Sequence, residues 1–179
     1  MKKTLFGSLV LLMACTMLMV GCDKENSQQQ EPEEVKPVAA VLEYAFEVTD
    51  SMRLVADFTI SYYDNDGKLQ TEQLKANKWS MTTKAALPAK LGVRVVGTVK
   101  ESFNPDNFEK LTIRRAFADA VYCVDAKGNV VGGKETGSNT KTQAIPGSGI
   151  REFFSKEHFF QTLYTVDAEG KKTYHKDWQ

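Results

Sequence analysis

The fold is decided by RLVADFTISYYDNDGKL, Arg53–Leu69, in which two different patterns follow each other. In the first half, apolar side chains alternate with mostly polar ones, and the apolar set is Leu54, Ala56, Phe58, Ile60 and Tyr62. A period of two residues is typical of a β-strand with one buried face. The second half, Asp64–Lys68, contains a Gly, which adopts positive φ at little cost, as a tight turn requires. The stretch therefore predicts a strand that ends in a turn.

The same turn pattern occurs in three places along the chain. YYDNDGKL (Tyr62–Leu69), CVDAKGNV (Cys123–Val130) and TVDAEGKK (Thr165–Lys172) each place an Asp three residues before a Gly. A calcium-binding EF-hand loop needs Gly at its sixth position and Glu at its twelfth. Counted from Asp64, the Gly is the fourth residue and Lys75 is the twelfth. We therefore interpret all three segments as β-hairpin turns of type I with a Gly bulge.

Alternating segments surround these turns and predict further strands. Besides residues 54–62, the expected strands are Ala40–Thr49, Leu69–Thr83, Leu91–Val99, Leu111–Val124, Phe160–Val166 and Thr173–Trp178. A change of parity within Leu69–Thr83 predicts a bulge or break near Asn77. Leu111–Val124 also fits helical spacing, but its strand-rich neighbourhood and the turn that follows it favour a strand.

The remaining segments are expected to connect these strands. Glu101–Lys110 and Lys84–Lys90 each contain a Pro and read as connections. Gly132–Gly149 is rich in Gly, Ser and Thr, which predicts a long loop with at most a short edge strand at Thr140–Ala144.

One short helix is expected near the C-terminus, over residues 150–156, with Ser148 as its candidate cap. Short strands with tight turns and at most one helix are the signature of two packed sheets. The sequence therefore predicts an all-β fold, a single antiparallel β-sandwich of about seven strands that occupies residues 40–179.

The N-terminal segment has the layout of a secretory signal. Met1–Lys3 is positively charged, an apolar run covers Leu5–Val20, and the small residue Gly21 precedes Cys22. A membrane-spanning anchor is the alternative, since eighteen uncharged residues are about the shortest span that crosses a bilayer. The absence of a positive cluster directly after the run favours the signal peptide, residues 1–21.

Met19-Val20-Gly21-Cys22 resembles a bacterial lipobox, with Met in place of the usual Leu. The resemblance implies that the Cys22 thiol receives a diacylglycerol group, that the peptide is cut after Gly21, and that the new amine is acylated. Leu12–Cys15 is a competing box, but it would leave apolar residues exposed after the lipid. A second acyl chain turns reversible membrane binding into a firm anchor.

Residues 22–39 read as an acidic tether between this anchor and the domain. The segment is rich in Gln, Glu and Pro and has no apolar periodicity, so we expect it to be disordered. Asp23-Lys24-Glu25 resembles in part the surface-export signal of Bacteroidota lipoproteins, whereas Asp directly after the Cys favours inner-membrane retention in proteobacteria. The whole layout resembles Bacteroidota-type lipoproteins with a small immunoglobulin-like sandwich. It implies a location in the cell envelope, at the outer membrane on its periplasmic or surface face.

Charge and motifs argue against nucleic acid, metal and catalysis. The chain has 23 basic and 23 acidic side chains with no Lys/Arg block, so no field favours nucleic acid. His158 and His175 stand apart without metal-ligand spacing, and Ser148 lacks the flanking Gly residues of a nucleophile elbow. Cys123 lies in an apolar strand, where a buried, inert thiol is expected. The sequence therefore predicts no enzyme, no cofactor and no metal.

Four aromatic residues are candidates for a ligand-facing platform: Tyr63, Trp79, Tyr122 and Trp178. Tyr63 and Tyr122 have parity opposite to the buried face of their strands, so both are expected on outer faces. Packing, or cover for the second face of a sheet, is the alternative role for at least half of them. The functional hypothesis is a membrane-tethered, non-catalytic binding or adhesion module whose partner is an envelope protein or a glycan. A structural component of an envelope complex is the alternative, and an enzyme is a second one.

Overall fold

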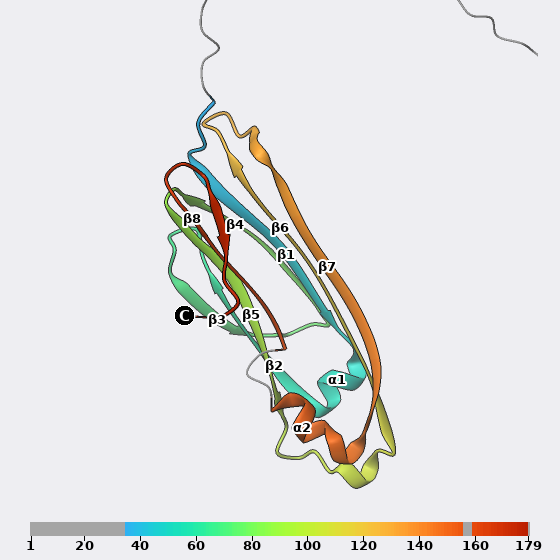
Figure 1. The fold of residues 1–179 in the computed structure, drawn as a ribbon. Helices are drawn as coiled ribbons and strands as arrows, with labels where there is room; N and C mark the ends of the chain where they lie inside the picture. Colours follow the sequence, from blue (N-terminus) through green and yellow to red (C-terminus); the bar gives the residue numbers. More distant parts are fainter. Residues whose placement is uncertain (1–34, 156–158, 179) are drawn as a thin grey trace, which may run out of the picture. The chain divides into compact units, whose positions relative to one another are not determined.

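The computed structural model describes residues 35–155 and 159–178, and it confirms the all-β sandwich. Within these residues, nine strands form two antiparallel sheets. The four-stranded sheet has the order β4-β1-β6-β7, and the five-stranded sheet has the order β3-β2-β5-β8-β9 (Figure 1). The strands are β1 (Ala39–Val48), β2 (Ala56–Tyr63), β3 (Leu69–Gln73), β4 (Lys78–Ala86), β5 (Ala89–Val99), β6 (Lys110–Val124), β7 (Val130–Pro146), β8 (Phe160–Val166) and β9 (Lys172–Tyr174).

The core lies between the sheets and is built from alternate residues, as the period-two pattern requires. Strand β1 contributes Leu42, Tyr44, Phe46 and Val48, and β2 contributes Ala56, Phe58 and Ile60; all are buried. The rings of Phe46 and Phe58 are part of an aromatic cluster that also includes Phe154, Phe159 and Phe160. Each large apolar side chain that is fully buried contributes about 1.5–3 kcal/mol.

The three predicted hairpin turns are confirmed. In each turn, the Oδ1 of Asp64, Asp125 or Asp167 accepts hydrogen bonds from the backbone N–H groups two and four residues later. The Gly residues three positions on have φ of 72°, 87° and 82°, a region that favours Gly. These Asp carboxylates therefore stabilise their own turns by hydrogen bonds to the turn backbone.

The segment before β2 differs from the prediction. Residues Asp50–Val55 form a short helix, α1, and β2 begins only at Ala56. Leu54 was expected on the buried face of a strand, but its side chain is 69% exposed. The helix instead buries Met52 and Val55, which lie three residues apart and therefore on one face.

The expected strand Leu69–Thr83 is two strands in different sheets. Strand β3 pairs with β2, whereas β4 pairs with β1, so the chain crosses between sheets at residues 74–77. The break predicted near Asn77 therefore exists, and it is the crossover. The connection expected at Lys84–Lys90 is reduced to Leu87-Pro88, because β4 extends to Ala86 and β5 begins at Ala89.

The largest error of prediction concerns Gly132–Gly149, which is not a loop. Most of it belongs to β7, a strand of 17 residues that pairs with β6 along its length. Nearly all residues of β7 are exposed on both faces, so no apolar alternation marks it in the sequence. Hydrophobic periodicity does not identify edge strands that are exposed on both faces.

Helix α2 spans Ile150–Phe154, within the range that the sequence predicts. Ser148 does not cap it: the cap residue is Gly149, and no side chain caps this helix end. Residues 156–158, the rest of the predicted helix and His158, lie outside the described residues. Strand β9 is shorter than the predicted strand Thr173–Trp178 and ends at Tyr174.

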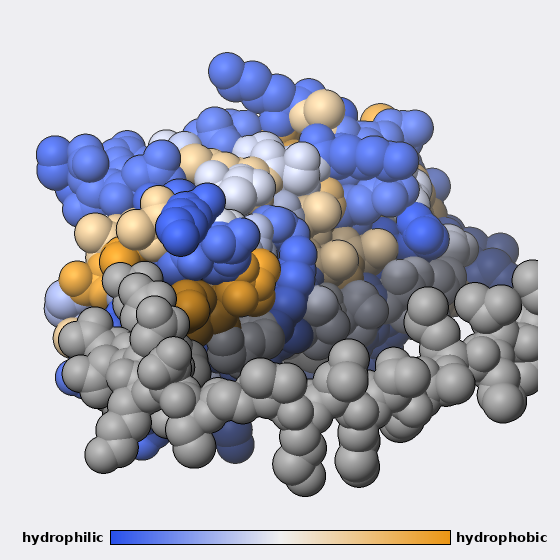
Figure 2. Space-filling view, turned by 90° about the horizontal axis from the view of Figure 1, so that it is seen from above, coloured by the Kyte–Doolittle hydropathy of each residue, from blue (hydrophilic) through white to orange (hydrophobic). Residues whose placement is uncertain are grey.

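The two ends of the sandwich differ. Residues 35–38 enter at one end, where Pro37 lies against the β8–β9 turn at Gly170, and α1 and α2 lie together at the other end (Figure 1). Figure 2 shows that the entry end is mostly hydrophilic, with small separate apolar patches. No helix among residues 35–155 and 159–178 is long and apolar enough to span a membrane. The predictions for residues 1–34, Gly21 and Cys22 included, lie outside the described part of the chain.

Candidate binding face

The four candidate aromatic residues do not form one platform. Trp79 points between the sheets, where its ring stacks on Tyr44 at 5.3 Å and packs against Tyr62 at 5.6 Å between ring centres. Its indole Nε1–H donates a hydrogen bond of 2.5 Å to Oε1 of Glu72. Trp79 therefore closes the sandwich at the edge where β4 meets β2 and β3.

Tyr63 and Trp178 contact each other on the outer face of the five-stranded sheet. Their ring centres are 5.5 Å apart, and Lys90 Nζ lies 4.9 Å from the centre of the Tyr63 ring. A side chain at Gly92 would collide with the Trp178 ring, so this Gly leaves the space that the indole occupies. The chain after β9 thus folds back over the sheet and covers Tyr63, which is only 9% exposed.

A small hollow of about 290 Å³ lies beside this C-terminal segment. His175 lines it together with Lys90, Lys176 and Asp177. The imidazole Nε2 of His175 is 2.8 Å from the hydroxyl of Thr165 and is already engaged there. The volume is at the lower limit for small-molecule sites.

Tyr122 lies on the outer face of the four-stranded sheet, as its parity predicts. Its hydroxyl donates to Glu43 Oε1 at 2.7 Å, and Lys134 Nζ lies 4.7 Å from the centre of its ring. The ring also packs on a small cluster formed by Ala39, Val41 and Val124. Tyr122 is thus both packed and half-exposed at one end of this face.

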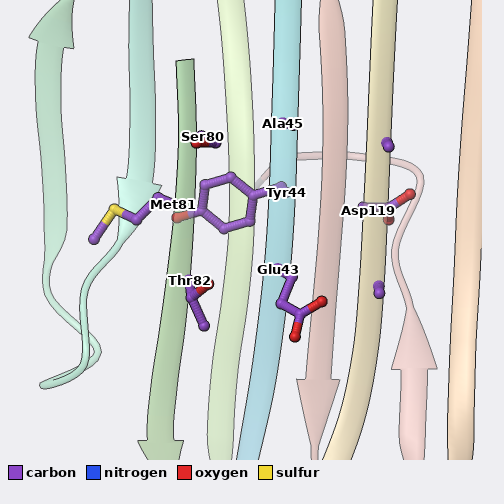
Figure 3. Close-up of a pocket in the computed structure, with 9 residues that line it drawn as sticks. Glu43, Tyr44, Ala45, Ser80, Met81, Thr82 and Asp119 are labelled. Atoms are coloured by element: carbon purple, nitrogen blue, oxygen red, sulfur yellow. The ribbon is translucent and has the colours of Figure 1, made fainter.

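The middle of the same face is a shallow trough. Alternate outward positions of four adjacent strands carry only small side chains: Ala45 on β1; Ser80 and Thr82 on β4; Ala116, Ala118 and Ala120 on β6; and Thr136, Ser138 and Thr140 on β7. Two adjoining hollows of about 520 and 450 Å³ occupy it and share Ala45, Ser80 and Ala118. Figure 3 shows the floor of the first hollow, with β4, β1 and β6 running side by side.

Ionic clusters stand at both ends of the trough. At one end, Glu43 Oε2 accepts a hydrogen bond of 2.7 Å from Lys134 Nζ, beside the hydroxyl of Tyr122. At the other end, Glu47 pairs with Arg114 at 3.2 Å and with Lys78 at 4.0 Å. The trough therefore has a neutral floor of methyl and hydroxyl groups between two ends that each carry both signs of charge.

The electrostatics of Glu43 identify it as a fixed anion. The hydrogen bond from Lys134 and then that from Tyr122 lower the pKa of the Glu43 carboxyl, because both stabilise its ionised form. The pKa of Tyr122 is raised in turn, chiefly because its hydroxyl donates to this carboxylate. Both groups hold their ordinary charge at neutral pH and can orient a polar ligand.

Asp119 belongs to the strand that floors the trough, but its carboxylate lies on the other side of the sheet. Asp119 Oδ2 accepts a hydrogen bond of 3.1 Å from the hydroxyl of Thr162 on β8. Burial raises the pKa of the Asp119 carboxyl, and the Thr162 hydrogen bond opposes that rise. This carboxylate is half-buried on the inner face of the sheet, on the strand next to β7.

Sequence reasoning missed the trough because small side chains are not conspicuous. A signal does exist: Ala-x-Ala-x-Ala at residues 116–120 and Thr-x-Ser-x-Thr at residues 136–140. Both place small residues at period two on strands that turn out to be neighbours. Recognising their importance requires knowing that β7 is a strand at all.

No group of three His, Cys, Asp or Glu side chains that could hold a metal ion occurs in the described residues. Comparison with known proteins found no match to a family model, to a curated protein or to a solved structure. The fold and this face therefore define the class of the protein by physical chemistry alone: a two-sheet β-sandwich with a trough on its four-stranded sheet.

Proposed function

We propose that the chain is a lipid-anchored protein of the bacterial cell envelope that carries a non-catalytic β-sandwich for binding or adhesion. The anchor is supported by the position of Cys22, which stands at the border between an apolar run and a hydrophilic segment. The binding role is carried by the trough between the clusters at Glu43 and Glu47.

The shape and chemistry of the trough favour an extended ligand. Its floor crosses neighbouring strands and offers methyl and hydroxyl groups, which pack against and hydrogen-bond a chain lying flat. The mixed charges at its ends suit a ligand that carries polar groups at intervals, such as a peptide segment of an envelope protein or a glycan.

The same chemistry supports binding rather than catalysis. A general acid needs a carboxyl with a raised pKa, and the pKa of Glu43 is lowered. Glu47 is held between two cations. The lowered pKa keeps the Glu43 carboxyl ionised at neutral pH, so it is not a proton donor there.

The trough can be tested by filling it. Ala118 is exposed at its centre, so Ala118→Trp should occupy the hollow without disturbing the core. Thr98→Trp is the matched control, because Thr98 is exposed on the outer face of the five-stranded sheet. Peptide and glycan arrays probed with the labelled mature chain should show ligands that Ala118→Trp loses and Thr98→Trp retains. Silence of the wild-type chain on both arrays, or equal binding by both variants, would count against the trough.

The anchor is tested by a pair of cysteine variants. Cys22→Ser should release the protein from membranes or stall its processing, and it should abolish fatty-acid labelling. Cys15→Ser is the matched control, because Cys15 belongs to the competing lipobox and should be removed with the signal peptide. If Cys22→Ser fractionates and labels like the wild type, the protein is not a lipoprotein anchored at Cys22.

A structural component of an envelope complex is the second candidate function. The observation that favours it is the long open edge of β7, which offers a site for strand addition. Affinity purification from detergent extracts separates the two candidates. A stoichiometric envelope protein that co-purifies through detergent favours the structural role, and an array ligand without such a protein favours the binding module.

A further inference from the structure

The edge of β7 is unusual among the four sheet edges of this sandwich. Strands β3 and β9, at the edges of the five-stranded sheet, have five and three residues. Strand β4 has nine residues, and its backbone at Lys84 is capped by the side chain of Asn65. Strand β7 has 17 residues, and of the described strands only β6 pairs with it.

A long open edge is a template for another strand, and proteins usually block such edges with Pro, bulges, short length or charged side chains. In β7, Pro occurs only at the last residue, Pro146. A bulge lies near the other end, where the register with β6 shifts and Gly132 and Gly133 have φ of 72° and 85°. The nine residues from Lys134 to Thr142 carry no Pro and no bulge, and their charged side chains are those of Lys134, Glu135 and Lys141.

The charges on this segment favour a second copy of the same strand. If two β7 strands pair antiparallel about a twofold axis at Ser138, Glu135 of each copy lies opposite Lys141 of the other. The two residues are six positions apart and so project from the same face of the strand. The same register places Lys134 opposite Thr142, so it pairs the whole of Lys134–Thr142, the segment between the bulge and the C-terminal end of β7.

We propose that two copies of this chain associate through β7, antiparallel, with Ser138 opposite Ser138, and that their four-stranded sheets join into one eight-stranded sheet. The pairing adds about eight to ten backbone hydrogen bonds over Lys134–Thr142 and two Glu–Lys cross-strand pairs. Because the twofold axis is perpendicular to the sheet, the two troughs lie on the same face of the joined sheet. This proposal does not depend on the ligand of the trough.

The pairing is compatible with the proposed anchor. Antiparallel strands place the entry ends of the two domains at opposite ends of the joined sheet, about 55 Å apart if that distance is set by the length of β7. The segment from Cys22 to Val38 can span roughly 60 Å when fully extended. Both copies can therefore be held in one membrane.

Disulfide trapping tests the register. In the proposed dimer the two Ser138 Cα atoms are about 4.5–5.5 Å apart, within the usual disulfide range of about 4.4–6.8 Å. Ser138→Cys in the full mature chain, held in detergent micelles with a mild oxidant, should give a covalent dimer. Thr136→Cys is the matched control: the two Thr136 residues are offset by four positions, about 13 Å, so it should give no covalent dimer. A mixture of Thr136→Cys and Thr140→Cys chains should form the heterodimer. The wild-type chain is the blank for Cys22 and Cys123.

Charge reversal provides an independent readout by sedimentation. Lys141→Glu places like charges opposite Glu135 twice and should weaken the dimer at least about fivefold. The double variant Glu135→Lys, Lys141→Glu restores opposite charges and should recover most of the affinity. Circular dichroism checks that both variants fold, because Glu135 also pairs with Lys172 within the chain.

Three results would overturn the proposal. One is a wild-type chain that sediments as a monomer up to its solubility limit, which is also the result expected if β7 accepts only a strand from a different protein. Another is equal trapping at positions 136 and 138, which indicates collision or another register. The third is a charge-reversed double variant that dimerises no better than Lys141→Glu alone.

Discussion

Thr83 links the two sheets through its hydrogen bond to Tyr63, and its bond with Tyr44 lies within the four-stranded sheet; removing both bonds tests the fold. The side chain of Thr83 on β4 is fully buried, and its Oγ1 lies 3.1 Å from the hydroxyl of Tyr44 on β1. The Thr83 hydroxyl donates a hydrogen bond of 3.1 Å to the backbone oxygen of Tyr63 at the end of β2. Burial raises the pKa of Tyr44 to about 12, so its phenol stays neutral and keeps its proton at physiological pH.

Thr83→Val keeps the shape of the side chain and removes both hydrogen bonds. It leaves the Tyr44 hydroxyl and the Tyr63 oxygen without this partner, and each buried unsatisfied group costs about 1–3 kcal/mol. The added methyl group recovers about 0.8 kcal/mol through burial. We therefore expect a loss of about 2 kcal/mol in the free energy of unfolding. Because native domains are stable by only about 5–15 kcal/mol, this is a substantial fraction.

Urea unfolding of the mature chain, followed by tryptophan fluorescence, measures this loss. Thr82→Val is the matched control, because Thr82 is the exposed neighbour that faces the trough, and its cost should lie within about 0.5 kcal/mol of zero. Tyr44→Phe should cost about 0.5–1.5 kcal/mol, since Thr83 keeps its bond to Tyr63. The double variant should lose less than the sum of the two single variants, because they share one hydrogen bond. If Thr83→Val is as stable as Thr82→Val, or if the two losses simply add, the hydrogen-bonded link between the sheets is not what stabilises them.

Three other predictions follow from single contacts. Burial raises the folded-state pKa of Asp119 above its unfolded value, so ionisation of this carboxyl lowers the stability of the fold as pH rises through the raised pKa. Asp119→Asn can still accept the Thr162 hydrogen bond, so it should be more stable than the wild type near neutral pH, and the gain should shrink on acidification. Urea titrations that show a less stable variant at about pH 7 would contradict this. Trp178→Ala should lower the free energy of unfolding by about 1–2 kcal/mol and expose Tyr63 to solvent. The exposure should appear as faster hydrogen exchange along β5 and β8. Unchanged exchange would mean that the C-terminal segment does not cover the sheet. Gly170→Ala should lower the melting temperature more than Gly128→Ala. Both Gly residues have positive φ, but a Cβ at Gly170 would lie 2.7 Å from Pro37, whereas a Cβ at Gly128 would contact no atom within 4 Å. Equal decreases in melting temperature would mean that Pro37 does not pack against the β8–β9 turn.

The four aromatic residues illustrate where sequence reasoning stops. The parity of Tyr63 and Tyr122 correctly places both on outer faces of their sheets. Parity does not say what lies above an outer face, and Tyr63 is covered by a residue more than a hundred positions away. The side chain of Trp79 lies between the sheets because β4 belongs to the sheet that packs against the one containing β2. The local sequence does not indicate to which sheet a strand belongs.

Local physics determined the strands with one buried face and the three turns of this protein. The period of two and the spacing of Asp and Gly each involve only a few neighbouring residues. Both can therefore be recognised in the sequence around Phe58, Gly67 and Gly128. Only the tertiary structure decided that β7 is a strand and that the outer face of the four-stranded sheet is a trough. Strand β7 is exposed to water on both faces, so its side chains show no apolar alternation. Its extended conformation is held by backbone pairing with β6, which the local sequence does not reveal. The trough exists because small residues from four strands become neighbours only when the chain has folded.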